Sequence, residues 1–170
     1  PWIANRMLHK PKVLTCVWDL QICPPTYDFV VFLNEAERAR VALGAEFIDL
    51  IIQPGPVGGF RNDDLPPNLG AREGMLYRVV MGMARLLPSV RNIEVLKARK
   101  PVKADHVFPE GYNVNNPITQ YGLHYSQFAS PVLRATVYAK LYVQRNFPKG
   151  YITITMRQAT HWPTRNSNIT

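Results

Sequence analysis

Short apolar runs alternate along this chain with longer segments in which apolar residues recur every three or four positions. Residues 12–20 and 47–53 are apolar almost throughout, which is typical of strands buried on both faces of a parallel sheet. Residues 93–97 and 105–109 form two shorter runs of the same kind. Residues 151–156 alternate between β-branched and other side chains, which also indicates a strand.

The longer segments predict three helices, over residues 26–43, 71–87 and 130–146. Thr26 is a plausible N-cap for the first, and Gly44 fits the position just past its end. Ser130 followed by Pro131 is a start signal for the third, because proline is favoured at the first helical position.

This order of elements predicts an α/β fold: a Rossmann-like three-layer domain with a mostly parallel sheet and helices on both faces. We expect strands 12–20, 47–53 and 93–97 to be adjacent. The predicted core consists of Val13, Leu14, Val17, Phe29, Leu33, Ile48, Leu50, Ile51, Leu76, Val79, Val80 and Met83.

Length and cysteine content narrow the class of protein. A chain of 170 residues is long enough for a domain with a real core. Its apolar runs all fall short of the ~20 residues that a membrane-spanning helix requires, so a cytoplasmic location without a transmembrane segment is expected. Cys16 and Cys23 have no metal-binding spacing and are expected to be free thiols. Neither a metal nor a cofactor is predicted.

The chain is basic, with 20 Lys and Arg against 12 Asp and Glu and a net charge of +8. This charge is compatible with a solvated basic surface or with an anionic partner such as a nucleotide, a phosphosugar, a nucleic acid or an anionic membrane. Lys97, Arg99, Lys100 and Lys103 form the most basic patch, which is interpreted as a solvated loop. The aromatic residues are not interleaved with basic ones, which weighs against nucleic-acid binding.

Two loops that follow predicted strands carry candidate ligand-binding residues. Gly58, Gly59, Arg61 and Asn62 lie in a long loop of glycine, proline and asparagine after residues 47–53. This loop is either a binding loop or a solvated connection. Glu110 and Tyr112 follow the run 105–109. Because the carboxyl ends of parallel strands meet at one edge of the sheet, we expect the two loops to line one cleft.

The polar segment after the last predicted strand carries Arg157, Arg165, Asn166 and Asn168. Arginine suits a diphosphate because its planar guanidinium binds oxyanions through two parallel hydrogen bonds, and asparagine suits sugar hydroxyls because its amide both donates and accepts. These residues are therefore predicted to form an anion- and sugar-facing site. The alternative is that Arg157 pairs with a structural acid and that the segment is a capping turn.

The string ITITMRQATHWPTRNSN, which contains these residues, resembles an "ITLRQ…RNSN" element of bacterial glycosyltransferase-like proteins of the GT-B type. The segments CPPTYDFVVFLNEAE, IIQPGPVGGFRNDDL and FPEGYNV resemble the same group. The resemblance implies two Rossmann-like domains with a cleft between them. Residues 1–128 would be the N-terminal domain, and residues 129–170 would be a bridging helix with the first strand of a truncated second domain, or the last βα unit of the same domain.

The function that the resemblance implies is binding of a nucleotide-diphosphate sugar or a sugar acceptor, in bacterial surface polysaccharide synthesis. The partner would be the missing C-terminal domain, and the fragment would be inactive alone. Arg157 matches an arginine that contacts the nucleotide diphosphate in GT-B fucosyltransferases. Glu110 or His124 is a candidate general base, although a lone Glu or His is more often structural. A non-catalytic binding or assembly module and a basic nucleic-acid-binding domain remain open alternatives.

Overall fold

The computed structural model describes residues 11–62, 68–117 and 133–147. The chain divides into two units, one up to Arg134 and the other from Ala135 onward, and each is described by itself.

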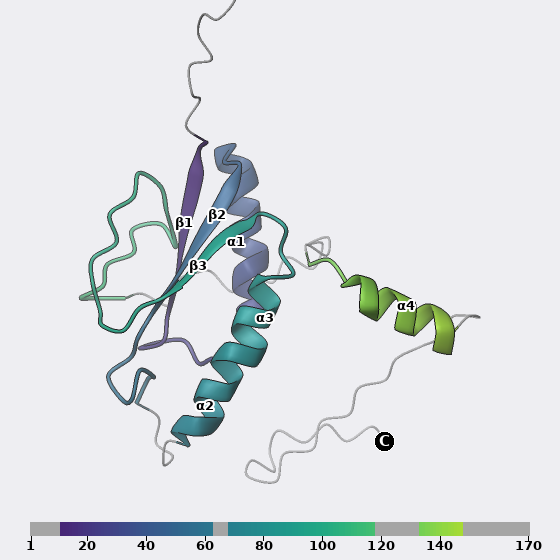
Figure 1. Ribbon diagram of the computed structural model, residues 1–170. Helices are drawn as coiled ribbons and strands as arrows, with labels where there is room; N and C mark the ends of the chain where they lie inside the picture. Colours follow the sequence, from purple (N-terminus) through teal and green to yellow (C-terminus); the bar gives the residue numbers. More distant parts are fainter. Residues whose placement is uncertain (1–10, 63–67, 118–132, 148–170) are drawn as a thin grey trace, which may run out of the picture. The chain divides into compact units, whose positions relative to one another are not determined.

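The first unit contains a parallel sheet (Figure 1). Its strands are β1 (Val13–Asp19), β2 (Phe47–Gln53), β3 (Val90–Val95) and β4 (Val107–Phe108), in the spatial order β3-β2-β1-β4. All of the pairings are parallel, with Val13 opposite Phe47 and Thr15 opposite Val107. The predicted α/β fold is therefore confirmed, and so is the adjacency of the strands predicted over 12–20, 47–53 and 93–97.

Strand β3 begins three positions earlier than the sequence pattern indicates, and the reason is pairing with β2. The Ile48 N–H donates to the Ser89 carbonyl at 2.8 Å, which starts the ladder before the apolar run does. The Arg91 guanidinium then donates to both carboxylate oxygens of Asp49, at 3.1 and 2.6 Å. A polar residue at an edge strand is compatible with pairing when its side chain finds a partner on the neighbouring strand.

Helix α1 (Phe29–Leu43) connects β1 to β2. The predicted cap at Thr26 is wrong, because the helix starts later and Asp28 occupies the N-cap position. Thr26 instead donates its hydroxyl proton to the Asp28 carboxylate, at 3.1 Å. The C-terminal prediction is confirmed: Gly44 has a φ of +68°, in the left-handed region that favours glycine.

The second predicted helix is a succession of three segments, α2 (Leu69–Met75), η1 (Leu76–Val80) and α3 (Met81–Ala84). It starts earlier than expected because the Asn68 side chain accepts a hydrogen bond from the Ala71 N–H at 3.0 Å, which caps the first turn. Its middle segment η1 is π-helical. The sequence periodicity predicted the buried stripe and gave no sign of this change in winding.

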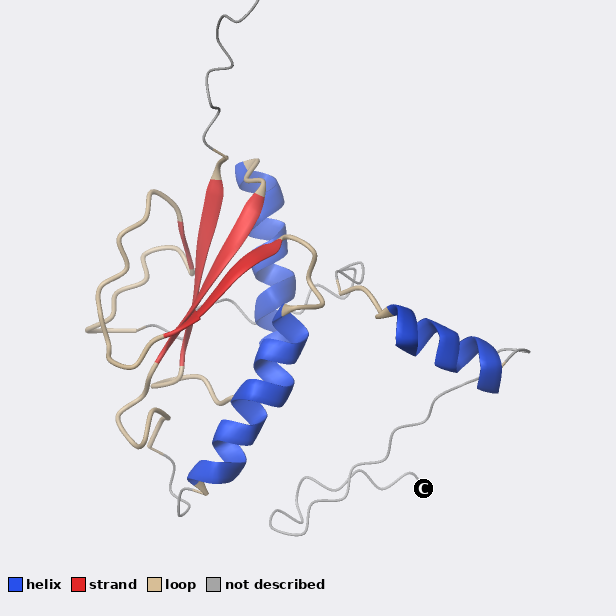
Figure 2. Ribbon diagram, viewed as in Figure 1, coloured by secondary structure: helices blue, strands red, loops and turns tan. Residues whose placement is uncertain are grey.

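The helices α1 and α3 contact each other and lie on the same face of the sheet (Figure 2). Two right-handed crossovers that step in the same direction, from β1 to β2 to β3, place both helices on one face. Across the other face runs the segment after β3, whose residues Lys100–Lys103 lie over Thr15 and Asp49. Among the described residues, helices therefore cover one face of the sheet, and an extended segment lies against the other. The prediction of helices on both faces is wrong for this part of the chain, because both crossovers step in the same direction.

The core lies between the sheet and the helices. Trp18 contacts the rings of Phe29 and Phe32, with both pairs of centroids 5.0 Å apart and edge-to-face. Most of the predicted core is buried, whereas Val13, Ile51, Val79 and Met83 are half-buried. Trp18, Phe32 and Ile52 are fully buried and were missing from the prediction.

The second unit contains α4 (Val137–Asn146). The Thr136 hydroxyl caps it by accepting a hydrogen bond from the Ala139 N–H at 3.1 Å. The helix predicted over residues 130–146 therefore begins later than expected, because residues 133–136 are described and are not helical. Ser130 and Pro131 themselves lie outside the described residues.

Candidate functional site

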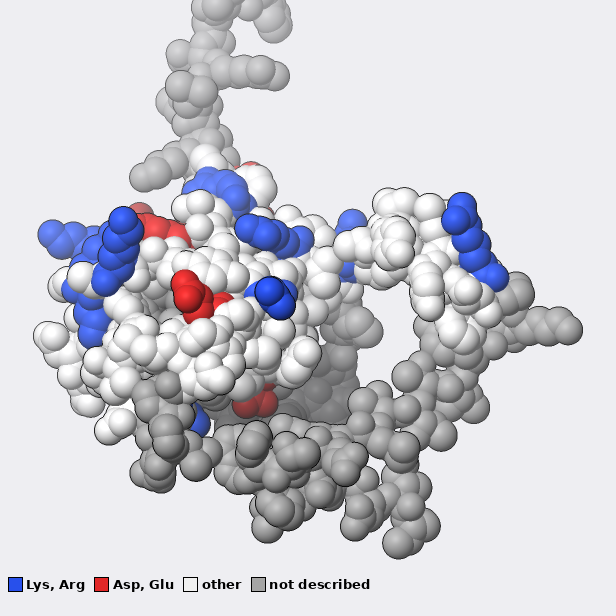
Figure 3. All heavy atoms as spheres, turned by 60° about the horizontal axis from the view of Figure 1, so that its bottom comes forward, with Lys and Arg blue, Asp and Glu red and all other residues white. Residues whose placement is uncertain are grey.

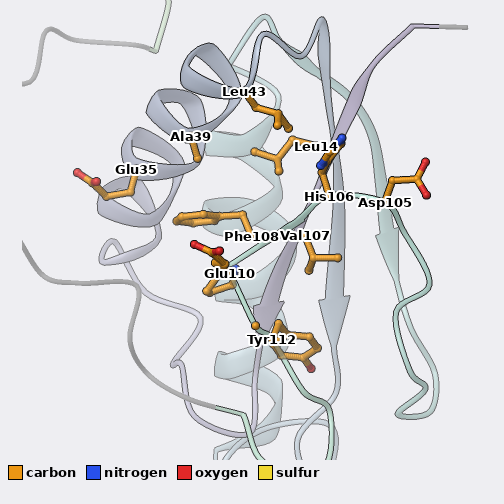
Figure 4. Close-up of a pocket in the computed structure, with 12 residues that line it drawn as sticks. Leu14, Glu35, Ala39, Leu43, Asp105, His106, Val107, Phe108, Glu110 and Tyr112 are labelled. Atoms are coloured by element: carbon orange, nitrogen blue, oxygen red, sulfur yellow. The ribbon is translucent and has the colours of Figure 1, made fainter.

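A cleft of about 720 Å³ opens beside β4, between that short edge strand and α1 (Figure 4). Leu14 from β1, Ala39 and Leu43 from α1 and Phe108 from β4 give it an apolar wall. The cleft exists because β4 pairs with β1 over Thr15 and Cys16 alone, so the rest of this edge of the β1 strand carries no neighbouring strand among the described residues.

The loop after β4 brings Glu110 and Tyr112 to this cleft. Pro109 starts a turn in which the Tyr112 N–H donates to the Pro109 carbonyl at 3.1 Å. Gly111 has a φ of +71° within that turn, which is why glycine is suited to it. Glu110 is exposed to solvent at the cleft.

The charged residues that line the cleft are Glu35, Asp105 and Glu110, with His106 beside them. Figure 4 shows the carboxylates of Glu35 and Asp105 at the two outer sides of the cleft, with Glu110 between them. No Lys or Arg is among its described lining residues. The cleft therefore has acidic chemistry in a chain whose net charge is +8.

Tyr112 also belongs to a polar cluster at the carboxyl end of β1. Its hydroxyl donates to the Asp19 Oδ2 atom at 2.6 Å. The Arg99 guanidinium donates to both carboxylate oxygens of Asp19, at 2.8 and 2.7 Å. Asp19 is 2% exposed, so these bonds compensate the loss of water around its carboxylate.

Arg99 also forms hydrogen bonds with the loops that follow β2 and β4. It donates to the carbonyl of Pro54, which follows β2, at 2.8 Å and to the carbonyl of Val114, which follows β4, at 2.6 Å. The hydrogen bond with Asp19 raises the pKa of Arg99. Burial, followed by the hydrogen bond to Asp19, raises the pKa of Tyr112 well above its usual range. The interpretation of Arg99 as part of a solvated patch is wrong, because its guanidinium is bonded to a buried acid.

This cluster occupies a special position in the topology. The chain steps from β1 outward to β3 and then returns to place β4 on the other side of β1. Ligands of open α/β sheets bind in the crevice at such a reversal, beyond the carboxyl ends of the strands. Here Asp19, Arg99 and Tyr112 fill the end of β1 with bonds among themselves, and the large cleft lies alongside β4 instead.

The loop after β2 folds back on itself. The Val57 N–H donates to the Phe60 carbonyl and the Phe60 N–H to the Val57 carbonyl, both at 2.9 Å. Gly58 and Gly59 between them have φ values of +55° and +88°, as a two-residue hairpin turn of type I′ requires. The positive φ values of the turn therefore explain the two glycines without a bound ligand.

The described residues of the two loops do not line one shared cleft, contrary to expectation. Among the described residues, the cleft beside β4 is lined from β1, α1 and residues 105–112, whereas Gly58 and Gly59 line a separate pocket of about 290 Å³. Arg61 accepts a hydrogen bond from Arg72 Nη1 through its backbone carbonyl, at 2.8 Å, and Asn62 is exposed. The two loops follow carboxyl ends of parallel strands as predicted. The loop after β2, however, packs against α2 and lines its pocket together with Val95 of β3.

Other predicted residues lie outside the described part of the chain: His124, Arg157, Arg165, Asn166 and Asn168. In the described ranges, no group of three or more His, Cys, Asp and Glu side chains has the arrangement of a metal site. None of the helices described is long and apolar enough to cross a membrane. Cys16 and Cys23 are buried thiols that form no disulfide, and burial raises the pKa of the Cys16 thiol, which keeps it protonated and unreactive.

Asp19 was not among the site residues predicted from the sequence. One signal for it was present: an acidic residue directly continues an apolar strand that is buried on both faces, and a buried carboxylate needs a cation. Its partner Arg99 lies 80 positions away and could not be named from local pattern.

Comparisons with known proteins give no match: no protein family, no curated protein and no solved structure is similar to this chain.

Proposed function

We propose that this chain is the sugar-binding part of a glycosyltransferase and that a sugar acceptor binds in the cleft beside β4. The observation that carries the proposal is Glu110, a carboxylate placed in a cleft with an apolar wall of Leu14, Leu43 and Phe108. A sugar ring has apolar C–H faces that pack on such a wall, and hydroxyls that donate to a carboxylate.

The acidic lining favours the acceptor over the nucleotide sugar in this cleft. Asp105 and Glu110 would repel a diphosphate, whereas they accept hydrogen bonds from neutral hydroxyls. The charge of Glu35 is offset by its ion pair with Arg38, at 3.3 Å. The volume of about 720 Å³ lies in the range of small-molecule sites, which run from roughly 300 to 1,000 Å³. The diphosphate of the donor would belong to the basic residues predicted for it, Arg157 and Arg165.

Glu110 would act as the general base in the transfer. The acceptor hydroxyl oxygen forms a bond to the anomeric carbon of the donor while its proton passes to the Glu110 carboxylate. The bond between that carbon and the donor phosphate oxygen breaks, and the nucleoside diphosphate leaves with the electron pair. The parallel α/β sheet and the resemblance of the terminal ITITMRQ…RNSN segment support this class of reaction.

The described basic residues offer less support for nucleic-acid binding. Arg38, Arg40, Arg91, Arg99 and Lys100 each form an ion pair with an acidic residue. On the face that Figure 3 presents, Lys and Arg stand in separate groups with Asp and Glu among them. A duplex or single strand would instead require a continuous basic path along its phosphates.

The test is titration of the 170-residue chain with a panel of neutral mono- and disaccharides and with nucleoside diphosphates, followed by ligand-observed NMR. Glu110→Gln keeps the shape of the side chain and removes its charge. It should weaken saccharide binding by about ten- to a hundredfold, because a hydrogen bond to a charged group contributes ~1.5–3 kcal/mol.

The matched control is Glu46→Gln, since Glu46 is an exposed acid that does not line the cleft. Saccharide affinity that is the same in Glu110→Gln as in Glu46→Gln would remove the acceptor from this cleft. Saccharide binding that depends on Glu110, without sugar transfer when a nucleotide-diphosphate sugar is supplied as donor, would favour a non-catalytic binding module.

A further inference from the structure

A second pocket, of about 290 Å³, lies at the carboxyl ends of β2 and β3, apart from the cleft beside β4. The turn at Gly58 and Gly59 forms one wall, and the helical face that carries Leu69, Glu73 and Tyr77 forms the other. The carboxyl end of a parallel sheet is where α/β proteins bind ligands. The pocket shares no lining residue with the cleft beside β4.

The floor of this pocket is apolar and almost fully buried. Phe60, Leu76 and Leu96 line it, and their exposed fractions are 5%, 4% and 7%. These three side chains pack against or beside the core, so they do not need a ligand to hold their places. An apolar surface at a pocket floor favours a ring that packs against it.

The glycine wall is also fixed before any ligand arrives. Its turn is closed by the two hydrogen bonds between Val57 and Phe60, and the Gly55 N–H donates to the Gly59 carbonyl at 2.8 Å. Arg72 ties the loop to α2 through the Arg61 carbonyl, at 2.8 Å. A wall held in this way loses little conformational entropy on binding.

Two polar side chains face this pocket from the helix. Glu73 and Tyr77 are four positions apart, so they lie on one side of the helix. Tyr77 is the second residue of the π-helical segment Leu76–Val80, which follows α2. Such π-helical turns are frequent at functional sites. Tyr77 is 50% exposed, and a large aromatic side chain held at a pocket rim offers a stacking surface.

The charge of the lining excludes phosphate recognition here. Glu73 is the charged residue among the described residues that line the pocket, and no Lys or Arg accompanies it. A carboxylate accepts hydrogen bonds through two oxygens and therefore matches two adjacent N–H donors. Hydroxyl-rich rings would find too few polar partners against Phe60, Leu76 and Leu96.

We propose that this pocket binds a planar nitrogen heterocycle, a nucleobase with two adjacent N–H donors of the guanine type. The ring lies on the apolar floor with one face against Tyr77, and Glu73 accepts from the ring N–H and the exocyclic amine. The volume fits one ring system and leaves any sugar and phosphates outside. This site is independent of the acceptor cleft, and its existence does not rest on sugar transfer.

Guanosine, inosine and adenosine are the probes, titrated into the 170-residue chain by calorimetry without phosphate groups. Guanosine should bind more tightly than inosine, which lacks the exocyclic amine, and adenosine more weakly still. Tyr77→Ala should weaken guanosine binding by about five- to a hundredfold, the range that loss of a base–aromatic stack gives. Glu73→Gln should abolish the preference for guanosine over inosine.

Tyr27→Ala and Glu46→Gln are the matched controls, because both residues are exposed and line neither pocket, and they should leave guanosine binding unchanged. Three results would overturn the proposal. They are no binding of any of the nucleosides, guanosine binding that survives both Tyr77→Ala and Glu73→Gln, and binding of guanosine diphosphate without binding of guanosine. The last would show that the phosphates alone are recognised.

Discussion

The loops that follow β2 and β4 start from equivalent places and end in different structures. Each leaves the carboxyl end of a parallel strand, and each contains a glycine with positive φ. The loop after β2 closes on itself through backbone bonds between Val57 and Phe60. The loop after β4 also has a backbone bond, from the Tyr112 N–H to the Pro109 carbonyl, and in addition its Tyr112 side chain donates to the buried Asp19. The first lines a small apolar pocket, and the second a large acidic cleft.

This difference shows that the end of a strand locates a loop without deciding what surrounds that loop. The content of each site comes from the element that the loop packs against. The loop after β2 meets α2 and contributes its glycines to a pocket with an apolar floor. The loop after β4 meets an edge of the sheet that has room beside α1, where Glu110 stays exposed.

One guanidinium connects the two loops, and its removal should have the largest effect. Arg99→Ala leaves the buried Asp19 carboxylate without its ion pair and frees the carbonyls of Pro54 and Val114. Breaking a buried pair from one side costs about 3–5 kcal/mol. We expect the lower end, about 3 kcal/mol, because the Arg99 side chain is 25% exposed. Urea unfolding measures it.

Lys97→Ala is the control for this change, since Lys97 is an exposed basic residue of the same segment and should alter stability by less than about 0.5 kcal/mol. Equal losses in the two variants would show that the guanidinium adds nothing beyond surface charge, and the comparison of the loops would lose its common anchor.

Tyr112→Phe separates the loops, because it removes one hydrogen bond from the loop after β4 and leaves Arg99 in place. A hydrogen bond to a charged group contributes about 1.5–3 kcal/mol, so the variant should lose that much stability at neutral pH. Saccharide binding in the cleft should weaken, and guanosine binding should not. A loss of guanosine binding as well would mean that the loops respond as one unit.

The same variant carries a pH signature. The pKa of Tyr112 is raised in the folded protein, so its stabilising effect is fully present below the unfolded value of about 10 and is lost as pH rises above that value. The stability difference between the parent chain and Tyr112→Phe should therefore shrink in alkaline solution, as pH-dependent urea unfolding would show. A difference that stays constant above pH 10 would place the effect in packing and not in the hydroxyl.

Local patterns predicted what is local in this fold. The apolar runs gave the strands β1 and β2, and the signal for the hairpin turn was present too, because Gly58 and Gly59 stand between the apolar Val57 and Phe60. Partners distant in sequence were beyond such patterns. In the sequence, Arg99 is one of four basic residues that lie close together in the chain. Its structural role comes from its ion pair with Asp19, which lies 80 positions away in the sequence.

The candidate site shows the same limit. Glu110 and Tyr112 were placed correctly after a strand, but the strand they follow lies at the far side of β1, away from β2. The edge of the sheet at which β4 is added depends on the connection after β3. That connection is short and irregular, so no periodicity in the sequence predicts where it leads. The prediction of a shared cleft was therefore wrong, although each loop was correctly placed after its strand.

Substitution of a glycine in each loop should have the smallest effect and sharpen the comparison furthest. Gly59 and Gly111 have φ values of +88° and +71°, and an added Cβ would have no heavy atom within 4 Å at either. Alanine there is strained by backbone conformation alone, so Gly59→Ala and Gly111→Ala should each cost about 1–2 kcal/mol. Gly82→Ala, in α3 with equally open space, is the control and should stabilise by up to about 1 kcal/mol.

Binding assays on the same two variants then test whether the loops act separately. Gly59→Ala distorts the hairpin turn and should weaken guanosine while leaving saccharide binding intact. Gly111→Ala lies between Glu110 and Tyr112 and should do the reverse. Because the stability losses match, a difference in binding reports the local shape of each loop and not a general loosening of the fold. Parallel losses of both ligands in both variants would contradict two independent sites and favour one connected surface.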